Sequence, residues 1–376
     1  ILIYNYLREK NIVIPQKVAH EKAEKFEGAY VKEPQVGMHK WVMSFDLNSL
    51  YPHLIMQYNI SPETLVPSEP VTGLVDKLLA GKASNPTEHC MTPNGAFFRK
   101  DKRGFLPEIM ETMYNDRTKY KKLMLQASQE YENTKNPRLL KDISKYNNIQ
   151  MAKKISLNSA YGAIGNNYFR YYDLMIAAAI TTSGQLSIRW IEKSLNIYLN
   201  KLLETDHVDY VIASDTDSVY ITFDRLVAKL FGEGTETRTI VNFLDKIAKE
   251  KLEPFIEKSY TALSQVTNAY EQKMQMAREV IADMGIEAVK SSTPQVCRDK
   301  IKEALKIIMN EDSKVLNTFI QDFRSDFMKL EPENIAYPRS VNGLEKFSSS
   351  NGMFAKGAPI HCKGAILYNH LLKTKK

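Results

Sequence analysis

Apolar runs that stop at polar or acidic residues mark the strands of this chain. Residues 41–46 are mostly apolar and stop at Asp46, which predicts a buried strand. Two further runs, 208–213 and 218–223, flank the polar segment 214–217 and predict a pair of strands joined by a turn. The pattern therefore places carboxylates where buried strands end.

Most other segments have helical character. After the first strand, Asn48 and Ser49 are candidate caps of a helix over 48–57, while the stretch 61–105 is rich in Pro, Asn and Gly and is typical of loops. Further helices are predicted over 107–131, 138–163, 174–204, 237–262, 295–310 and 313–329. The first two of these are rich in Lys and Arg and predict a protruding basic hairpin. Strands among many helices, without βαβ alternation, predict an α+β fold.

Composition and charge exclude several classes of protein. The chain has 376 residues, 43% hydrophobic and 25% charged, which excludes disordered and fibrous proteins and predicts two or three domains. The net charge of +7 permits a polyanionic partner such as nucleic acid without requiring one. Three cysteines without a CxxC pair argue against a disulfide scaffold or a cysteine-rich zinc site and favour a reducing compartment.

Neither a membrane span nor a signal peptide is expected from the sequence. The longest uncharged run lies between Asp173 and Arg189, and its 15 residues are too few and too polar to cross a bilayer. The chain begins at Ile1 without a signal-peptide pattern and ends abruptly at Lys376. We therefore expect it to be part of a larger polypeptide.

The segment from Asp46 to Pro52 carries the first candidate chemistry. A carboxylate at the end of a buried strand lies where a helix begins, so several free backbone N–H groups point in one direction. This arrangement suits a divalent cation beside a phosphate, with Asp46 on the metal and the start of the helix on the anion. Taken alone, the segment is better explained by Asp46 acting only as a helix cap.

Two carboxylates lie at the predicted turn between the second and third strands. Asp215 and Asp217 are two residues apart, so in an extended chain their side chains point to the same side. Repelling carboxylates that are held together usually need a cation between them. Ordinary turn chemistry, which favours Asp, Thr and Ser, explains the same residues without any function.

Two predicted helices carry polar groups at helical spacing. Lys154, Asn158 and Tyr161 fall on one face, and Arg117 and Lys121 are four residues apart on the preceding helix. Three cations on a helical hairpin can hold a triphosphate through charge-assisted hydrogen bonds. For the two cations of the preceding helix alone, a solvated basic face is the simpler interpretation.

The order of these segments is more specific than any of them alone. The patterns Asp-Leu-x-Ser-Leu-Tyr-Pro from Asp46, Lys-x-x-x-Asn-Ser-x-Tyr-Gly from Lys154 and Asp-Thr-Asp-Ser from Asp215 resemble motifs A, B and C of the family B DNA polymerases. Within that family, the chain resembles the replicative polymerases of T-even-like phages. The further segments that carry this resemblance are 28–34, 60–64, 169–174, 290–294 and 361–364.

The resemblance implies a right-hand polymerase architecture within the α+β class, with an antiparallel-sheet palm, helical-hairpin fingers and a mostly helical partial thumb. It also implies a DNA-directed DNA polymerase, a nucleotidyltransferase that adds dNTPs to a primer 3′-hydroxyl and releases pyrophosphate. The implied domains are 1–106, a connector with the first part of the palm; 107–165, the fingers; 166–290, the second part of the palm; and 291–376, the partial thumb.

The resemblance implies two Mg²⁺ ions, for which Mn²⁺ can substitute. Asp46 and Asp217 would hold them with help from the Leu47 carbonyl, and Asp215 would be the lesser carboxylate. In such a mechanism one ion activates the primer 3′-hydroxyl, while the other binds the triphosphate and steadies the leaving pyrophosphate.

Nucleotide-binding roles are also implied by the resemblance. With Leu47, the backbone N–H groups of Ser49 and Leu50 would contact the nucleotide, and Tyr51 would stack under the sugar and exclude a ribose 2′-hydroxyl. The residues implied to bind the triphosphate are Arg117, Lys121 and Lys154, the last also as a proton donor to pyrophosphate. The residues implied to lie at the incoming nucleotide, the nascent base pair or the DNA are Asn158, Tyr161 and Gly162.

The implied partners are primer-template DNA and dNTPs. A separate exonuclease-containing chain and a sliding clamp are further candidate partners, and no membrane is expected. A phage-encoded polymerase of this kind is expected in the cytoplasm of its bacterial host.

The chain departs from the family pattern in several places. Only 45 residues precede Asp46, so the 3′→5′ exonuclease domain of the family is not expected within this chain. Ala213-Ser214 replaces the usual Tyr-Gly before Asp215. After Asp283 the chain lacks a Gly-rich loop and a Lys-Lys-x-Tyr strand, through an omitted segment or a deletion, and the thumb is truncated near Lys376. A second interpretation therefore stays open: a catalytically incomplete or split segment that binds primer-template DNA or a partner chain.

Overall fold

The computed structural model describes residues 2–17, 28–37, 39–232 and 234–282, together with Glu303 and Thr318. The chain divides into two units. One unit consists of Ile1–Gly37 and Met43–Ile281, and the other of Met38–Val42 and Ala282–Lys376. Nearly all described residues belong to the first unit, whose structure is given below.

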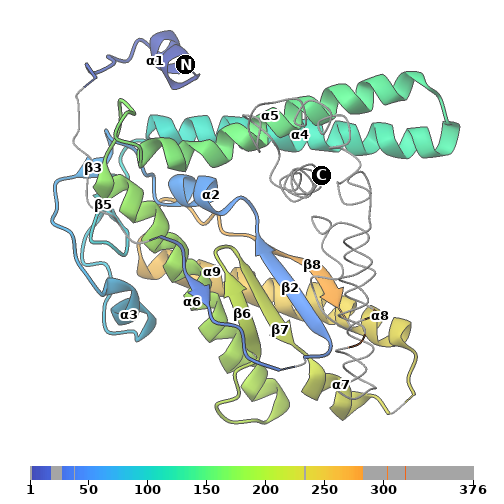
Figure 1. Ribbon diagram of the computed structural model, residues 1–376. Helices are drawn as coiled ribbons and strands as arrows, with labels where there is room; N and C mark the ends of the chain where they lie inside the picture. The colour runs from blue at the N-terminus through green and yellow to red at the C-terminus, as the bar shows by residue number, and fades with distance from the viewer. Residues whose placement is uncertain are drawn as a thin grey trace, which may run out of the picture. The chain divides into compact units, whose positions relative to one another are not determined.

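A five-stranded sheet carries the predicted strand-end carboxylates (Figure 1). Its strands are β1 (Val31–Lys32), β2 (Val42–Leu47), β6 (Val211–Asp215), β7 (Ser218–Thr222) and β8 (Met276–Ala282). They lie in the order β1-β6-β7-β2-β8, so strands that are distant in sequence are neighbours in the sheet. β6 pairs antiparallel with β7, with Asp215 opposite Ser218, and with β1, with Asp215 opposite Val31. Both predicted sites of carboxylates therefore belong to one sheet.

A second, smaller sheet lies within the stretch 61–105, where mainly loop was expected. Its strands are β3 (Leu65–Val66), β4 (Cys90–Met91) and β5 (Phe97–Phe98), in the antiparallel order β3-β5-β4, and the helix α3 (Leu74–Leu79) lies in the same stretch. Strands of two residues are too short to produce an alternating pattern, which explains why the sequence did not indicate them.

The longer helices confirm the α+β class, with shifted ends. Their bounds are α1 (Leu2–Glu9), α2 (Leu50–Gln57), α4 (Phe105–Thr134), α5 (Arg138–Ile164), α6 (Leu174–Leu203), α7 (Asp224–Leu230), α8 (Thr237–Ile247) and α9 (Glu253–Val266). The single helix expected over 237–262 is instead α8 and α9 joined by a π-helical turn, η1 (Ala248–Leu252). The helices expected at 295–310 and 313–329 lie outside the described residues except for Glu303 and Thr318. Within the described ranges, no helix has the length and apolar character that a bilayer crossing requires.

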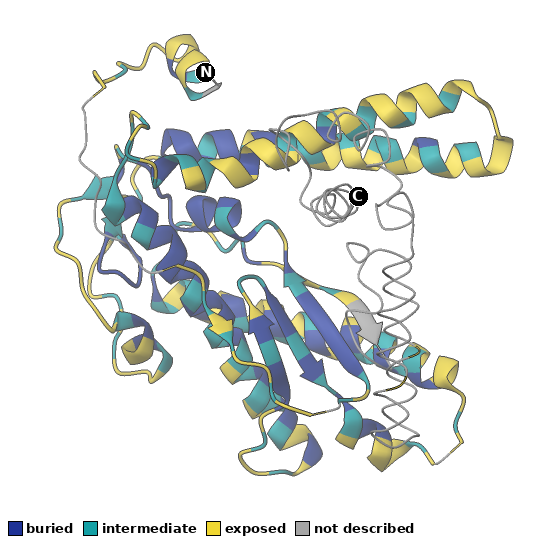
Figure 2. Ribbon diagram, viewed as in Figure 1, coloured by how far each residue is buried: buried dark blue, intermediate teal, exposed yellow. Residues whose placement is uncertain are grey.

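α6 is the central helix of the core, and Figure 2 shows it and the neighbouring strands largely buried. Asp173 starts the helix, because its Oδ1 accepts the Ile176 N–H at 3.0 Å. The buried hydroxyl groups of Thr182 and Ser187 donate to carbonyl oxygens one turn earlier, both at 2.8 Å. This uncharged but partly polar segment is therefore buried without leaving these hydroxyl groups unpaired.

α4 and α5 form the predicted helical hairpin, which projects beyond the sheet (Figure 1). Asn136 Oδ1 accepts the Arg138 N–H at 3.1 Å and starts the second helix. Lys153 Nζ lies 2.7 Å from Asp116 Oδ2 across the hairpin. The far part of the hairpin is mostly exposed (Figure 2), whereas its base packs on α2. The hairpin therefore brings its cations towards the end of β2 only near its base.

Lys32 of β1 is held by two carboxylates at the edge of the larger sheet. Its Nζ lies 2.5 Å from Glu192 Oε1 of α6 and 2.7 Å from Asp209 Oδ2. Burial lowers the pKa of Lys32, but the two carboxylates outweigh this effect and leave the pKa raised. The side chains of Lys32 and Glu192 are only 14% and 16% exposed, so either charge would be poorly hydrated without the other.

We expect Lys32→Met to lower the free energy of unfolding by about 3 kcal/mol, because it leaves a poorly hydrated carboxylate without its counter-charge. Lys229→Met is the matched control, since Lys229 pairs with Glu204 at 3.4 Å in an exposed position. That change should cost less than about 1 kcal/mol. Chemical denaturation followed by circular dichroism measures both values, and equally small effects would contradict the role of Lys32.

Candidate active site

The loop after β2 brings a carboxylate and the start of a helix together. Asp46 is the penultimate residue of β2, the chain turns at Asn48 and Ser49, and α2 begins at Leu50. Ser49 has a left-handed backbone, with φ 49° and ψ 60°, and its side chain makes no capping bond to α2. Its hydroxyl oxygen instead accepts a hydrogen bond from Arg117 Nη1 at 2.9 Å. Ser49 therefore occupies the predicted cap position but binds the neighbouring helix α4.

Backbone hydrogen bonds fix this loop beside two other parts of the sheet. The Leu47 N–H donates to the Asp217 carbonyl at 2.8 Å, and the Asn48 N–H donates to the Gln275 carbonyl at 3.0 Å. The first bond joins the end of β2 to the turn between β6 and β7. The second joins the loop to the segment that leads into β8.

The turn between β6 and β7 separates its two aspartates. Asp215 ends β6 and is exposed, while Asp217 is partly buried. Between them, Thr216 has a left-handed backbone with φ 55°. The Thr216 hydroxyl donates to Asp215 Oδ1 at 2.9 Å. The two carboxylates are therefore neighbours with different environments.

These elements and the base of the hairpin line one cavity of about 660 Å³. Tyr51 of α2 and Tyr161 of α5 meet in it, with ring centroids 4.6 Å apart. The predicted residues that line the cavity are Asp46, Leu47, Ser49, Leu50, Tyr51, Arg117, Lys121, Lys154, Asn158, Tyr161 and Asp217. Residues that are distant in sequence and were selected separately thus share one space.

Two predicted residues do not line this cavity. Asp215 lies beside it on the exposed end of β6. Gly162 is exposed on α5, and a Cβ atom placed on it would meet no other atom within 4 Å. The predicted roles of these two residues stay predictions.

The cavity also contains residues that sequence reasoning missed. Arg278 and Glu279 of β8 line it, together with Ala277. The apolar–polar pattern of 276–282 could have indicated a strand. It could not indicate where that strand lies, because β8 reaches the site by pairing with β2. Arg278 also pairs with Asp245 of α8, so its charge is shared with a residue outside the cavity.

The carboxylates of the cavity disfavour one another's ionisation. Burial raises the pKa of Asp46 to about 7, with further contributions from the negative charges of Asp217 and Glu279, while Lys154 opposes the shift. Burial also raises the pKa of Asp217; its own backbone N–H opposes this, and Asp215 and Glu279 add to it. A cation placed among these groups would relieve the repulsion.

The donor set fits a hard divalent cation whose ligand shell is completed by a substrate. Asp46, Asp217 and Glu279 supply carboxylate oxygens to one cavity, the ligand type that Mg²⁺ prefers. In the part of the chain that the structure describes, no three His, Cys, Asp or Glu side chains form a closed metal-binding group. Mg²⁺ commonly binds through one or two carboxylates with substrate phosphates and water, so this open arrangement suits a metal–nucleotide complex.

The cations of α4 and α5 face the same space as the carboxylates. Within the described ranges, Lys121 and Lys154 form no ion pair or hydrogen bond, whereas Lys153 on the adjoining position is paired with Asp116. Unpaired cations beside carboxylates can bind an anion that also carries a metal ion. The cavity is therefore suited to a polyphosphate.

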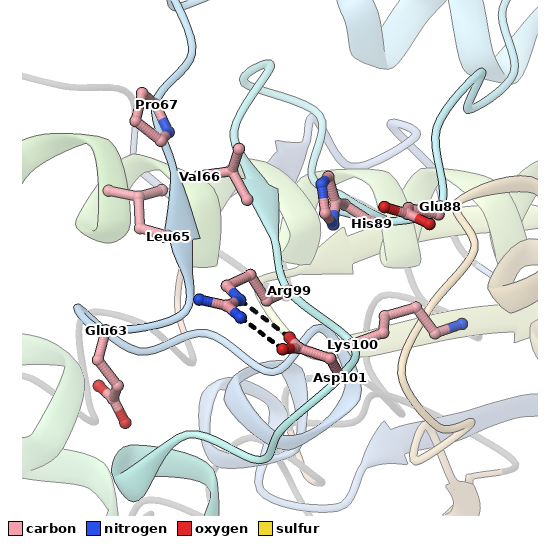
Figure 3. A pocket seen from close by; sticks show the side chains of 9 residues that line it. All are labelled: Glu63, Leu65, Val66, Pro67, Glu88, His89, Arg99, Lys100 and Asp101. Carbon is pink, nitrogen blue, oxygen red and sulfur yellow. Dashed lines mark hydrogen bonds and ion pairs between the residues drawn. The ribbon is translucent and has the colours of Figure 1, made fainter.

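A second cavity, of about 760 Å³, lies by the smaller sheet (Figure 3). Arg99 and Asp101 point toward one another along it, and Arg99 Nε donates to Asp101 Oδ1 at 2.9 Å. The charge of Arg99 is therefore compensated by its neighbour. The lining of this cavity includes none of the predicted site residues. We therefore assign the candidate chemistry to the cavity at the end of β2.

Comparison with known proteins decides the family. The profile of DNA polymerase family B matches residues 1–350. The chain belongs to the family B DNA polymerases. It is 32% identical to the DNA-directed DNA polymerase of Escherichia phage RB69, over 99% of this chain and 50% of that protein. It is 30% identical to the DNA-directed DNA polymerase of Enterobacteria phage T4, over 98% of this chain and 49% of that protein.

This family B chain spans about half the length of the two phage relatives. Because 99% of its 376 residues align over 453 positions with the phage RB69 protein, about 80 aligned positions have no counterpart here. The DNA polymerase delta catalytic subunit of Oryza sativa subsp. japonica is 34% identical over 57% of this chain and 18% of that protein. Family B polymerases use metal ions, which agrees with the oxygen-rich cavity.

His53 lies in the first turns of α2, directly behind the loop, and is only 5% exposed. Burial lowers its pKa; the Ser49 and Asn48 carbonyls oppose this shift, while the charges of Lys273 and Arg117 add to it. The unfolded chain therefore binds a proton at His53 at a higher pH than the folded chain does.

We expect His53 to make folding stability fall as the pH drops through about 6.5, the ordinary pKa of histidine, towards the lower folded-state value. Above that window the residue is neutral in both states and contributes no pH dependence. The His53→Asn variant should lose less stability between pH 7.5 and 5.5 than the unmodified protein. Denaturant titrations at both pH values measure the difference, and identical losses would contradict a depressed pKa.

Proposed function

We propose that this chain carries the catalytic centre of template-directed DNA synthesis, adding dNTPs to a primer 3′-hydroxyl with release of pyrophosphate. The observation that supports it best is the shared cavity, in which Asp46 and Asp217 lie with Arg117, Lys121 and Lys154. Carboxylates for metal ions and cations for a triphosphate are what phosphoryl transfer requires of a protein.

Asp46 and Asp217, with the Leu47 carbonyl, would hold two Mg²⁺ ions, for which Mn²⁺ can substitute. When bound, these ions supply activation of the primer hydroxyl and neutralisation of charge on the phosphates. Asp215, exposed beside the cavity, has a subsidiary role. Glu279 adds a negative charge that strengthens the attraction of this space for cations.

In the proposed reaction, the cations of the hairpin orient the triphosphate. Arg117, Lys121 and Lys154 bind its oxygens, and the backbone N–H groups of Ser49, in the loop, and of Leu50, at the start of α2, bind it from the end of β2. The primer 3′-hydroxyl gives up its proton to solvent, and its oxygen forms a bond to the α-phosphorus while the bond from that phosphorus to pyrophosphate breaks. Lys154 gives a proton to the leaving pyrophosphate.

In the proposed reaction, one tyrosine selects deoxyribose over ribose and another supports the nascent base pair. Tyr51 stacks under the sugar and leaves no room for a 2′-hydroxyl, and Tyr161, 4.6 Å from it, supports the nascent base pair. Asn158 lies at the incoming nucleotide on the same helix as Tyr161. Gly162 contacts the DNA on this proposal, and the space around it in the protein is open.

The larger architecture follows the same proposal. The five-stranded sheet is the palm, split between 1–106 and 166–290, and α4 and α5, which run from Phe105 to Ile164, are the fingers predicted over 107–165. The partial thumb predicted over 291–376 lies outside the described residues except for Glu303 and Thr318. Primer-template DNA and dNTPs are the substrates. An exonuclease-containing chain and a sliding clamp are further partners, and the reaction takes place in the cytoplasm of a bacterial host, as the phage relatives suggest.

A second function is favoured by one specific observation. About 80 positions of the alignment with the phage RB69 protein have no counterpart in this chain, and the sequence has no Lys-Lys-x-Tyr between Asp217 and Ser291. In the family pattern this strand grips the primer terminus, so a segment without it would bind primer-template DNA or a partner chain without catalysis. Gel-shift binding with no incorporation, even after addition of an exonuclease-containing fragment, would favour this function.

Primer extension with Mg²⁺ and dNTPs tests the main proposal. We expect Asp217→Asn to lower the rate of incorporation about 100-fold or more, because it removes a metal-binding charge from the reacting centre. Asp215→Asn is the matched control, at the other end of the same turn, and should have a much smaller effect. A gel shift should show that both variants still bind primer-template. Unchanged incorporation by Asp217→Asn would refute the assigned mechanism.

Tyr51 is expected to exclude ribonucleotides. Tyr51→Val should raise the relative use of NTPs over dNTPs roughly 10- to 100-fold, because it opens space for a 2′-hydroxyl. Tyr51→Phe keeps the ring and should keep the discrimination. Competition between labelled dNTP and NTP in primer extension measures the ratio, and equal discrimination by the valine and phenylalanine variants would contradict the role.

A further inference from the structure

His53 holds one carbonyl of the nucleotide-facing loop by two of its groups. Its Nδ1 lies 3.0 Å from the Ser49 carbonyl oxygen, and its backbone N–H donates to the same oxygen at 3.2 Å. A carbonyl oxygen can only accept a hydrogen bond, so Nδ1 must carry the proton. Burial lowers the pKa of His53 and so favours the neutral ring. A neutral ring has a single proton, which the Ser49 carbonyl places on Nδ1.

The residue that His53 holds has a conformation that needs support. Ser49 is left-handed, with φ 49°, which costs a residue with a Cβ atom roughly 1 kcal/mol or more. Such a conformation persists only where surrounding contacts over-determine it. Ser49 has three of them: two hydrogen bonds from His53 to its carbonyl and one from Arg117 to its hydroxyl oxygen.

His53 also contacts the helix that carries Arg117. Its ring meets the Tyr114 ring edge-on, with centroids 4.4 Å apart and an interplanar angle of 82°. Tyr114 lies one turn before Arg117 on α4, and Arg117 returns to Ser49. The contacts between His53, Ser49, Arg117 and Tyr114 therefore form a closed circuit between α2 and α4. Ser49 and Arg117 line the cavity, whereas His53 and Tyr114 do not.

We propose that His53 is a positioning residue for the incoming nucleotide. Its Nδ1–H fixes the Ser49 carbonyl, which belongs to the same peptide group as the Leu50 N–H, and so sets the direction of that N–H and supports the place of Arg117 through Ser49. Ser49, Leu50 and Arg117 all line the cavity proposed for the triphosphate. His53 itself does not line the cavity and takes no part in the chemistry. The inference rests on the proposed function of this cavity.

Two variants separate the hydrogen bond from the packing. His53→Leu fills the buried position with an apolar side chain of related size but removes the Nδ1–H donor. His53→Asn places an amide N–H the same number of bonds from the backbone as Nδ1, so it can still donate to Ser49. Thermal denaturation of both variants shows whether each one folds.

The affinity for dNTP and the maximal rate are measured separately by single-turnover primer extension. His53→Leu should raise the dissociation constant for dNTP about tenfold, the effect of one lost hydrogen bond, while changing the maximal rate less than about twofold. His53→Asn should restore most of the affinity. A purely structural role would instead lower the melting temperature of the leucine variant and leave its nucleotide affinity unchanged, which would overturn the inference.

The test distinguishes failure of the inference from failure of the proposed function. If the unmodified protein extends primers and His53→Leu binds dNTP equally well, His53 has no positioning role. If the unmodified protein extends no primer, the proposed function fails. In either case, ¹⁵N spectra of the His53 ring report the tautomer independently. A neutral ring protonated at Nδ1 is expected, and protonation at Nε2 instead would overturn the inference.

Discussion

One backbone hydrogen bond holds the two halves of the site together. The Leu47 N–H donates to the Asp217 carbonyl at 2.8 Å and so joins the end of β2 to the turn after β6. It brings Asp46 and Asp217 into one partly buried space, where burial, and after it the repulsion between their charges, raises the pKa of Asp46 to about 7. The remainder of the unit keeps this unfavourable arrangement in place: α6 packs against β6 and β7, and the base of the hairpin supplies cations to the cavity.

The backbone around these carboxylates is also strained. Ser49 and Thr216, each next to a turn that carries a carboxylate, are left-handed residues with side chains, at φ 49° and 55°. The Thr216 N–H donates to the Tyr30 carbonyl at 3.0 Å, and Ser49 is held by His53 and Arg117. Strain supported by specific contacts is typical of functional sites, since it fixes groups that would otherwise move apart. Charge repulsion and backbone strain therefore occur at the same place in this family B chain.

The sequence is informative where local pattern determines structure. The hairpin of α4 and α5 and the helix α6 follow from composition and periodicity, with ends shifted by a few residues. The motif residues that share the cavity can be chosen from the amino-acid sequence alone, because their spacing along the chain is specific. The sequence could not reveal that Asp215 would remain outside the cavity, since that depends on the left-handed turn at Thr216. The sequence also does not place Glu279 at the site, because β8 reaches the site through pairing with a strand distant in sequence. The role of each residue depends on bound substrates, so it is inferred from the resemblance of the motifs to those of family B polymerases.

Binding of Mn²⁺ together with a dNTP tests most directly whether these carboxylates and cations form one metal–nucleotide site. The paramagnetic resonance of the ion reports the bound fraction without requiring catalysis. Asp46→Asn and Lys154→Met should each weaken the joint binding of Mn²⁺ and dNTP about tenfold or more, because each removes a charge-assisted contact. Lys141→Met, on the exposed part of the hairpin, should have no such effect. If both site variants bind Mn²⁺ and dNTP as tightly as the unmodified protein, the shared cavity is not the nucleotide site.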